Sequence, residues 1–145
     1  MASEFRDIIF VSGSRAEFGQ VKELKKLVDE ILYPPDKTSM VIIGELASDF
    51  SGGLAKIPPL SDLMHADVVE TLLASNNAVG IAKSVGLGIS SLTDYFNLRS
   101  PSKVVLFGDR FEMYAAGVAA SLLEIETIHL HGGEVSGAKF DNFFR

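Results

Sequence analysis

The sequence contains no cysteine, which excludes a disulfide framework and any metal site built on thiolates. It also lacks an excess of basic residues, because 13 Lys and Arg stand against 19 Asp and Glu, for a formal net charge of −6. A nucleic-acid-binding domain needs a basic patch on a basic surface, so we expect no nucleic-acid partner. A few arginines at one strand end can still bind an anion locally.

Long apolar runs are missing too. None approaches the roughly 20 residues that a membrane-spanning helix needs, and the first six residues carry no apolar region of a signal peptide. We therefore expect no membrane partner and a cytoplasmic location. The length of 145 residues, with 47% hydrophobic and 22% charged residues, is typical of a globular domain with a substantial core.

What the sequence does contain is an alternation of strand-length apolar runs and helical patterns. Continuous apolar runs predict buried strands over 7–12, 39–44, 103–108 and 126–131. The pattern of residues 66–73 suits either a helix or a strand, and we favour a short strand. Apolar residues three and four positions apart predict helices over 17–32, 78–97 and 111–124. This alternation predicts an α/β fold with a mostly parallel sheet flanked by helices.

Several of the predicted strands end in glycine beside charged or titratable residues, and ligands bind at the carboxyl ends of parallel strands. Gly13 and Arg15 follow the first strand and precede a helix. A helix N-terminus with an arginine suits a phosphate, although the Gly-Lys-Ser/Thr ending of a Walker A loop is absent. The alternative is an ordinary turn with a solvated arginine.

The strand at 103–108 ends in Gly108-Asp109-Arg110. The Asp109 carboxylate has two candidate roles, as a cap of the next helix or as a general acid or base. Arg110 either pairs with Asp109 or contacts a ligand phosphate.

The last predicted strand leads into His129-Leu130-His131-Gly132-Gly133-Glu134. Alternation along a strand predicts that His129 and His131 point to one face, and His131, nearer the strand end, is the better functional candidate. A metal would need a third ligand that the spacing does not supply, so we predict no metal and no cofactor. Glu134 is a candidate acid or base, and Asp141 lies in a segment that we expect to turn back over the same edge.

These motifs together resemble the hydrolysing UDP-N-acetylglucosamine 2-epimerases of bacterial sialic and legionaminic acid synthesis. The resemblance covers residues 6–145, and the residues that carry it are 13–19, 82–88, 108–112 and 129–138. It implies a Rossmann-like domain that forms one half of a glycosyltransferase-B-like two-domain fold, with the active site in the cleft. Residues 6–145 would be the N-terminal domain, without the C-terminal UDP-binding domain, and we expect them to be inactive alone.

The family reaction implied by this resemblance converts a UDP-2-acetamido sugar and water to UDP and the free 2-epimeric sugar. Asp109 and Asp141 match catalytic positions, whereas Gly13, Arg15 and Arg110 match the ligand-binding part. The expected partner is a UDP-sugar, and the full-length form is expected to be a homo-oligomer.

The chain departs from the family pattern at His131, where several relatives carry a catalytic glutamate. Either His131 transfers the proton, which a histidine can do near neutral pH, or Glu134 does. Asn142 also replaces a carboxylate that is common beside Asp141. Two alternatives to N-acetylglucosamine epimerisation stay open: epimerisation of the UDP-2,4-diacetamido-trideoxy sugar of legionaminic acid synthesis, and a non-catalytic nucleotide-binding module.

Overall fold

The computed structural model describes residues 8–51 and 66–133. Its strands are β1 (Ile8–Ser12), β2 (Thr38–Ile42), β3 (Ala66–Val68), β4 (Lys103–Phe107) and β5 (Glu126–Leu130). Its α-helices are α1 (Arg15–Ile31), α2 (Gly44–Ala47), α3 (Ala78–Arg99) and α4 (Phe111–Leu122). Each predicted strand and helix is present, and most bounds agree within two residues; the short β3 covers only the start of its predicted range.

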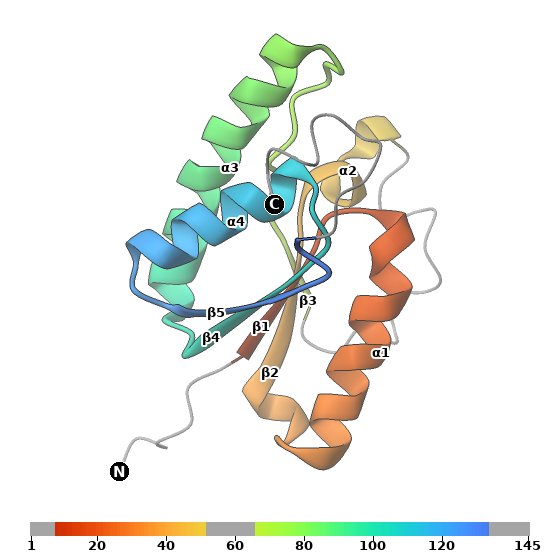
Figure 1. Cartoon of the computed structure of the whole chain (residues 1–145), viewed down its shortest axis with the longest axis vertical. Coiled ribbons are helices and arrows are strands. Elements are labelled where there is room, and N and C mark those ends of the chain that lie inside the picture. Colours follow the sequence, from red (N-terminus) through yellow and green to blue (C-terminus); the bar gives the residue numbers. More distant parts are fainter. Residues whose placement is uncertain (1–7, 52–65, 134–145) are drawn as a thin grey trace.

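The five strands form one parallel sheet in the order β3-β2-β1-β4-β5. From β1 the chain moves outward to β2 and β3, and then α3 returns it across the sheet to β4, on the other side of β1 (Figure 1). The strand order therefore reverses between β1 and β4. In open parallel sheets this reversal point is where ligands bind.

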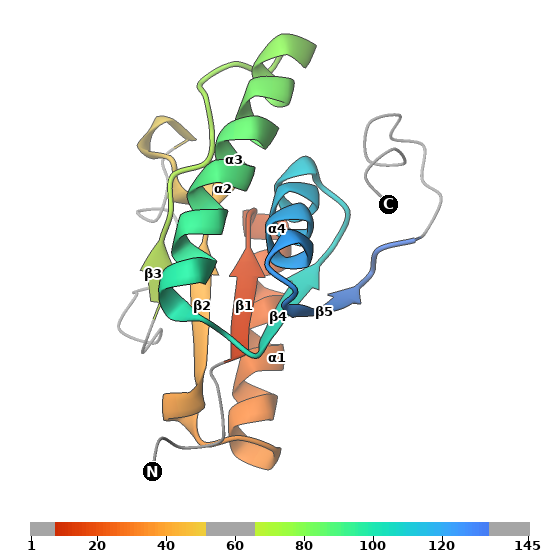
Figure 2. The same cartoon turned by 90° about the vertical axis from the view of Figure 1, so that its left-hand side faces the viewer.

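Helices cover both faces of the sheet, with α3 and α4 in front and α1 behind (Figure 2). The core on the α3 and α4 side is built from alternate strand residues such as Ile9 and Val104, packed on Phe96 and Met113. The intervening strand residues face α1 and form the second core. The three central strands are therefore nearly continuous apolar runs, as expected for strands buried on both faces.

The apolar stripe predicted on α1 is only partly buried. Val21 is buried, but Leu27 and Ile31 are 52% and 72% exposed. Lys25, on the expected polar side, is buried instead, and its ammonium lies 2.8 Å from the Asp29 carboxylate. Asp29 also accepts a hydrogen bond from the Thr38 hydroxyl, and this hydrogen bond links the helix to the start of β2.

Helix α3 packs through small residues at every fourth position. Gly80, Ser84 and Gly88 are buried along one line with Leu92 and Phe96. A Cβ on Gly88 would lie 3.0 Å from the Ala115 Cβ, so this glycine permits close approach of α3 to α4. Within residues 8–51 and 66–133, neither α3 nor any other helix combines the length and the apolar character needed to span a membrane.

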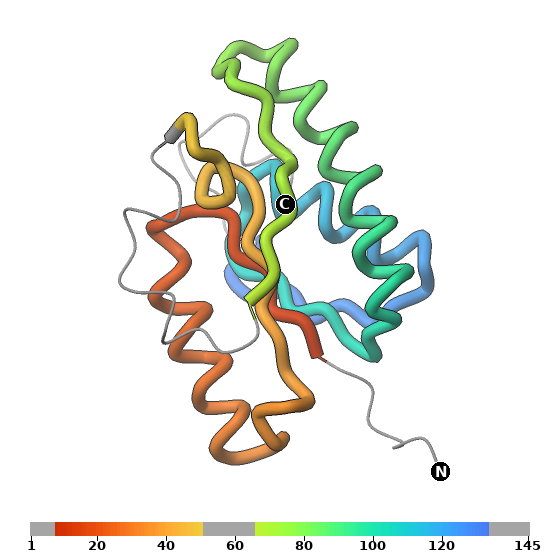
Figure 3. Tube along the Cα trace, turned by 180° about the vertical axis from the view of Figure 1, so that it is seen from behind, coloured from red at the N-terminus to blue at the C-terminus, as the bar shows by residue number. Residues whose placement is uncertain are grey.

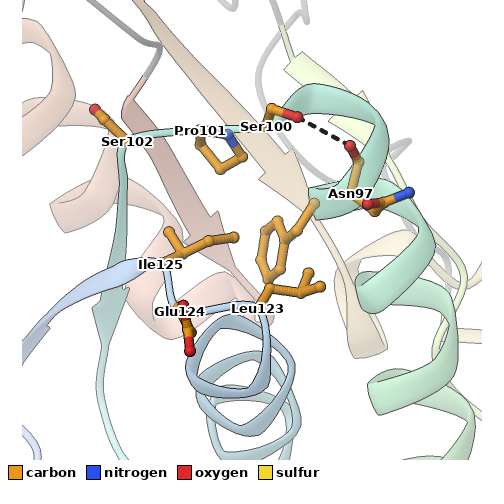
Figure 4. A pocket seen from close by; sticks show the side chains of 8 residues that line it. Asn97, Ser100, Pro101, Ser102, Leu123, Glu124 and Ile125 are labelled. Carbon is orange, nitrogen blue, oxygen red and sulfur yellow. Dashed lines mark hydrogen bonds between the residues drawn. The ribbon is translucent and has the colours of Figure 1, made fainter.

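A polar hollow lies at the amino end of the sheet, where α3 and α4 end and β4 and β5 begin (Figure 4). Ser100 and Glu124, the residues that follow the ends of these helices, adopt the left-handed conformation, with φ of 47° and 57°. The Ser100 hydroxyl donates to the Asn97 carbonyl at 3.0 Å. Glu124 is the single ionisable residue among those that line this hollow.

Candidate active site at the carboxyl end of the sheet

The centre of the candidate site is a fork between β1 and β4. Their ladder ends at Phe10 and Val105, whereas β1 stays paired with β2 as far as Ser12, and β4 with β5 as far as Phe107. The two central strands therefore part before their carboxyl ends. The first turn of α4 lies over the fork: a Cβ on Gly13 would be 3.2 Å from the Met113 Cε and 3.3 Å from the Glu112 Cβ.

Glycines after three neighbouring strands let acidic side chains approach the backbone here. At Gly44, with φ of +60°, a Cβ would lie 2.7 Å from the Glu112 Cγ. At Gly108, with φ of +89°, it would lie 2.5 Å from a carboxylate oxygen of Glu17. Only glycine combines such φ values with such close approach at low cost.

The segment that begins at Gly44 lies beside the start of α1 (Figure 3). The Leu46 amide donates to the Gly13 carbonyl at 3.3 Å, which links the two strand ends. This third strand end was not among the candidate positions from the sequence. It adds Glu45, the second residue of α2, to the site.

Arg110 pairs with Glu112, a residue that the sequence did not single out. Its Nε donates to Glu112 Oε2 at 3.3 Å, and its Nη2 donates to Glu112 Oε1 at 3.2 Å. The same Nη2 lies 3.7 Å from an oxygen of Glu45. Side-chain exposure separates the two carboxylates: 1% for Glu112 and 41% for Glu45.

The ionisation of this cluster reflects burial and mutual attraction. Burial raises the pKa of Glu112 above its ordinary value, and the attraction of Arg110 opposes that rise. Burial acts to lower the pKa of Arg110, but Glu112, followed by Glu45 and Glu17, raises it on balance. Arg110 is therefore a fixed cation facing three acidic side chains.

Sequence reasoning assigned no role to Glu112, although it is the one acidic residue in the largely apolar helix α4. That isolation, two residues after an arginine, is the signal that identifies it. Glu45 carried no such signal, because its contact with Arg110 joins segments 65 positions apart in the chain (110 − 45).

The other residues predicted around the first two strand ends lie where expected. Arg15 is the exposed first residue of α1, and Gly13 and Gly108 flank the fork. Asp109 is half-buried immediately before α4. The cap position of α4, for which Asp109 was considered, is occupied by Arg110, whose side chain makes no capping hydrogen bond.

The prediction that His129 and His131 share one strand face is wrong. Strand β5 ends at Leu130, and His131 has a φ of 55°, which turns its side chain away from the strand alternation. Its ring packs against Phe107, with the ring centres 4.9 Å apart and the ring planes tilted by 45°. The His129 ring lies on the other side, beside Leu106 and Met113, and its Nε2 donates to the Gly108 carbonyl at 2.5 Å.

His129 thus ties the end of β5 to the end of β4, and only His131 remains a candidate for chemistry. Glu134 and Asp141, the other two candidate acids or bases, lie outside the described residues. Among residues 8–51 and 66–133, no three His, Asp or Glu side chains form a group that could hold a metal ion.

Comparison with known proteins identifies the family to which the chain belongs. A family model described as UDP-N-acetylglucosamine 2-epimerase matches residues 50–145. The chain belongs to this family. The resemblance predicted from the motifs is therefore confirmed.

Two relatives illustrate the similarity and the share of each protein that it covers. It is 29% identical to the polysialic acid biosynthesis protein P7 of Escherichia coli, over 97% of this chain and 35% of that protein. It is 32% identical to the UDP-N,N'-diacetylbacillosamine 2-epimerase (hydrolyzing) of Legionella pneumophila, over 91% of this chain and 34% of that protein. The chain spans about a third of the length of these relatives.

Solved structures share the fold. The UDP-N-acetylglucosamine 2-epimerase of Rickettsia bellii superposes with a TM-score of 0.74 at 19% identity, over 98% of this chain and 36% of that one. The enzyme of Neisseria meningitidis, solved with UDP-GlcNAc bound, gives 0.70 at 20% identity, over 90% and 33%. The predicted fold, a parallel sheet flanked by helices as in this glycosyltransferase-B-like family, is confirmed.

Proposed function

We propose that this chain is the N-terminal Rossmann-like domain of a hydrolysing UDP-sugar 2-epimerase, and that a C-terminal domain outside these residues completes the UDP site. The observation that supports it most is the fork between β1 and β4, where α1 and α4 both begin and Asp109 and Arg110 lie side by side. Helix N-termini and an arginine favour a diphosphate. The buried Ser14 hydroxyl, which has no hydrogen-bond partner among the described residues, adds a donor beside Gly13.

The proposed reaction has two stages. A base removes the proton from C2 of the UDP-2-acetamido sugar, the C1–O bond breaks, and UDP leaves with the electron pair, which gives a glycal. Water then adds its oxygen to C1, and an acid delivers a proton to C2 on the opposite face. The products are UDP and the free sugar with C2 inverted, which for UDP-N-acetylglucosamine is N-acetylmannosamine.

This chemistry needs an acid or base on each face of the sugar and a cation for the departing diphosphate. We assign Asp109 to one proton transfer, because its carboxyl follows the fork directly. His131 or Glu134 supplies the second, with Asp141 as a further carboxylate. Gly13, Arg15 and Arg110 hold the diphosphate side of the substrate.

The test compares the chain alone with a form extended by the second domain. Incubated with UDP-N-acetylglucosamine, the chain alone is expected to release no UDP at enzymatic rates, whereas the extended form releases UDP and N-acetylmannosamine. Asp109→Asn in the extended form should abolish UDP release, measured by ³¹P NMR. If the Asp109→Asn variant still released UDP, Asp109 would have no catalytic role. If the isolated chain turned over UDP-N-acetylglucosamine, the proposal that its active site is incomplete would be refuted.

The second candidate substrate is the UDP-2,4-diacetamido-trideoxy sugar. Two relatives at 32% and 30% identity are named as hydrolysing epimerases of N,N'-diacetylbacillosamine nucleotides, whereas the Neisseria UDP-N-acetylglucosamine 2-epimerase is 28% identical. Parallel assays of the extended form with both nucleotide sugars decide between them. A preference is expressed as the ratio of kcat/KM for the two.

A further inference from the structure

We infer that Arg110 holds two carboxylates of different kinds: Glu112 is a fixed positioning residue, and Glu45 is a placeholder that the anionic group of the ligand displaces. The inference deepens the proposed function and rests on it for the identity of the ligand, a nucleoside diphosphate group.

The first step is the geometry of the Arg110–Glu112 pair. Two nitrogens of one guanidinium face the two oxygens of one carboxylate at 3.2 and 3.3 Å, a forked arrangement that fixes the plane of the arginine head. Glu112 is almost inaccessible to solvent, at 1% side-chain exposure. The narrow spaces above Gly13 and Gly44 hold its methylene groups in place.

A ligand cannot replace Glu112, because withdrawal of Arg110 would leave a buried carboxylate without its cation. Breaking a buried pair in this way is strongly unfavourable. Glu112 therefore stays on the inner side of the guanidinium whatever binds on the outer side. This is the property expected of a group that orients a ligand-binding arginine.

Glu45 has the opposite properties. It approaches Arg110 no closer than 3.7 Å, beyond hydrogen-bond distance, and its side chain is 41% exposed. Ion pairs of this kind contribute little to stability and are easily exchanged. Because the Arg110 side chain is itself 37% exposed, its outer edge is open to a ligand anion where Glu45 now stands.

The consequence is a pair of opposite effects from the same chemical change. Replacing Glu45 with glutamine removes a competitor for the outer edge of Arg110 and should tighten anion binding. Replacing Glu112 with glutamine removes the anchor and should weaken it. A purely structural cluster would give losses, or no change, for both.

The experiment measures dissociation constants for UDP, inorganic pyrophosphate and uridine by ¹H–¹⁵N NMR titration of the chain. Glu45→Gln should bind UDP and pyrophosphate about two- to five-fold more tightly, the range of an exposed ion pair. Glu112→Gln should bind them about ten-fold more weakly, the scale of losing a charge-assisted hydrogen bond. Uridine, which lacks the anion, should be affected by neither substitution.

The matched control is Glu126→Gln, which removes another partly exposed, ion-paired glutamate at the amino end of the sheet, 63% exposed against 41% for Glu45. It should change each constant by less than about two-fold, because charges beyond a Debye length are screened. A double-mutant cycle adds Arg110→Gln: in that background Glu45→Gln should give no gain. This cycle keeps the inference testable if Glu112→Gln fails to fold.

The outcomes separate the inference from the proposed function. If wild type binds UDP but Glu45→Gln gives no gain or a loss, the placeholder role is overturned and the proposed function stands. If folded Glu112→Gln binds like wild type, the positioning role is overturned. Binding of UDP and pyrophosphate with the expected pattern supports the anion site even if uridine contributes nothing, because the proposed C-terminal domain completes the UDP site. Absence of any binding of either anion overturns the ligand-binding role of Arg110, whereas UDP release by the extended form tests the proposed function separately.

Discussion

Both ends of the sheet carry polar groups, but they differ in which ends of the helices face them. Helices α1 and α4 begin at the carboxyl end, so their unpaired amides and positive dipole ends face the fork between β1 and β4. Helices α3 and α4 end at the amino end, and the hollow there (Figure 4) is lined by the residues that follow them. A hollow alone therefore does not indicate the site, since only the carboxyl end combines helix N-termini with a cation.

The ion pairs at the two ends differ in the same way. At the amino end, Lys103 pairs with Glu126, whose side chain is 63% exposed, so this carboxylate stays solvated. At the carboxyl end, Arg110 pairs with a glutamate that is almost fully buried. Burial makes the second pair costly to break, which is why its substitution should affect both stability and binding.

The largest effect is expected from Gly44→Ala. The new Cβ would meet the Glu112 Cγ at 2.7 Å on a backbone with φ of +60°. Left-handed backbone and overpacking together should lower the free energy of unfolding by about 3 kcal/mol, measured by urea denaturation. Gly86→Ala is the control, because its Cβ meets nothing within 4 Å in α3, and it should instead stabilise by about 0.5–1 kcal/mol. Equal effects would show that the carboxyl end is not tightly packed.

Arg110→Met should have the next largest effect, and the effect should depend on pH. The pKa of Glu112 already lies above its ordinary value of 4.5, so the folded state binds this proton more tightly than the unfolded state. Stability from this group is then lost as pH rises from about 4.5 through the raised pKa. Removing the cation raises the pKa of Glu112 further, so that the loss of stability continues to higher pH.

At pH 7 we expect Arg110→Met to be about 2 kcal/mol less stable than wild type, at the lower end for a pair with one partly exposed partner. The difference should shrink as pH falls toward 4.5, which urea denaturation at several pH values measures. Arg110→Lys keeps the charge and should lose less. A difference that is independent of pH would mean that Glu112 is not the group responsible.

Features that depend on neighbouring residues could be predicted from the sequence, whereas features that depend on contacts between distant segments could not. The strands are continuous apolar runs such as residues 103–107, and local pattern is enough to locate them. His131 was misplaced because its own φ of 55° ends the alternation, one residue before the Gly132-Gly133 pair that marks a turn in the sequence. Glu45 was missed because its role depends on a partner from a distant segment, and spacing along the chain carries no information about such a contact.

A smaller effect is expected at the amino end from Glu124→Gly. Glu124 follows the end of α4 with φ of 57°, a conformation that costs a non-glycine residue about 1 kcal/mol. Glycine should therefore raise the free energy of unfolding by about that amount, seen as a higher melting temperature. If the substitution instead lowered the free energy of unfolding, the Glu124 side chain would stabilise the fold by more than its left-handed backbone costs.

The smallest effect is expected from Glu124→Gln on ligand binding. If the amino-end hollow takes no part in recognition, the UDP dissociation constant should change by less than about two-fold, the effect of a distant screened charge. The same NMR titration used for the carboxyl end measures it. A larger change, or UDP-dependent shifts of the Phe96 and Asn97 amides, would place a ligand at the wrong end of the sheet.

The contact between His129 and Gly132 has an evolutionary consequence. The imidazole that ties β5 to the Gly108 carbonyl occupies the space that any side chain at position 132 would enter. Selection therefore acts on the two positions as one unit. We expect homologues that keep the histidine to keep the glycine, and those that replace the histidine with a small residue to be the ones that tolerate alanine at position 132.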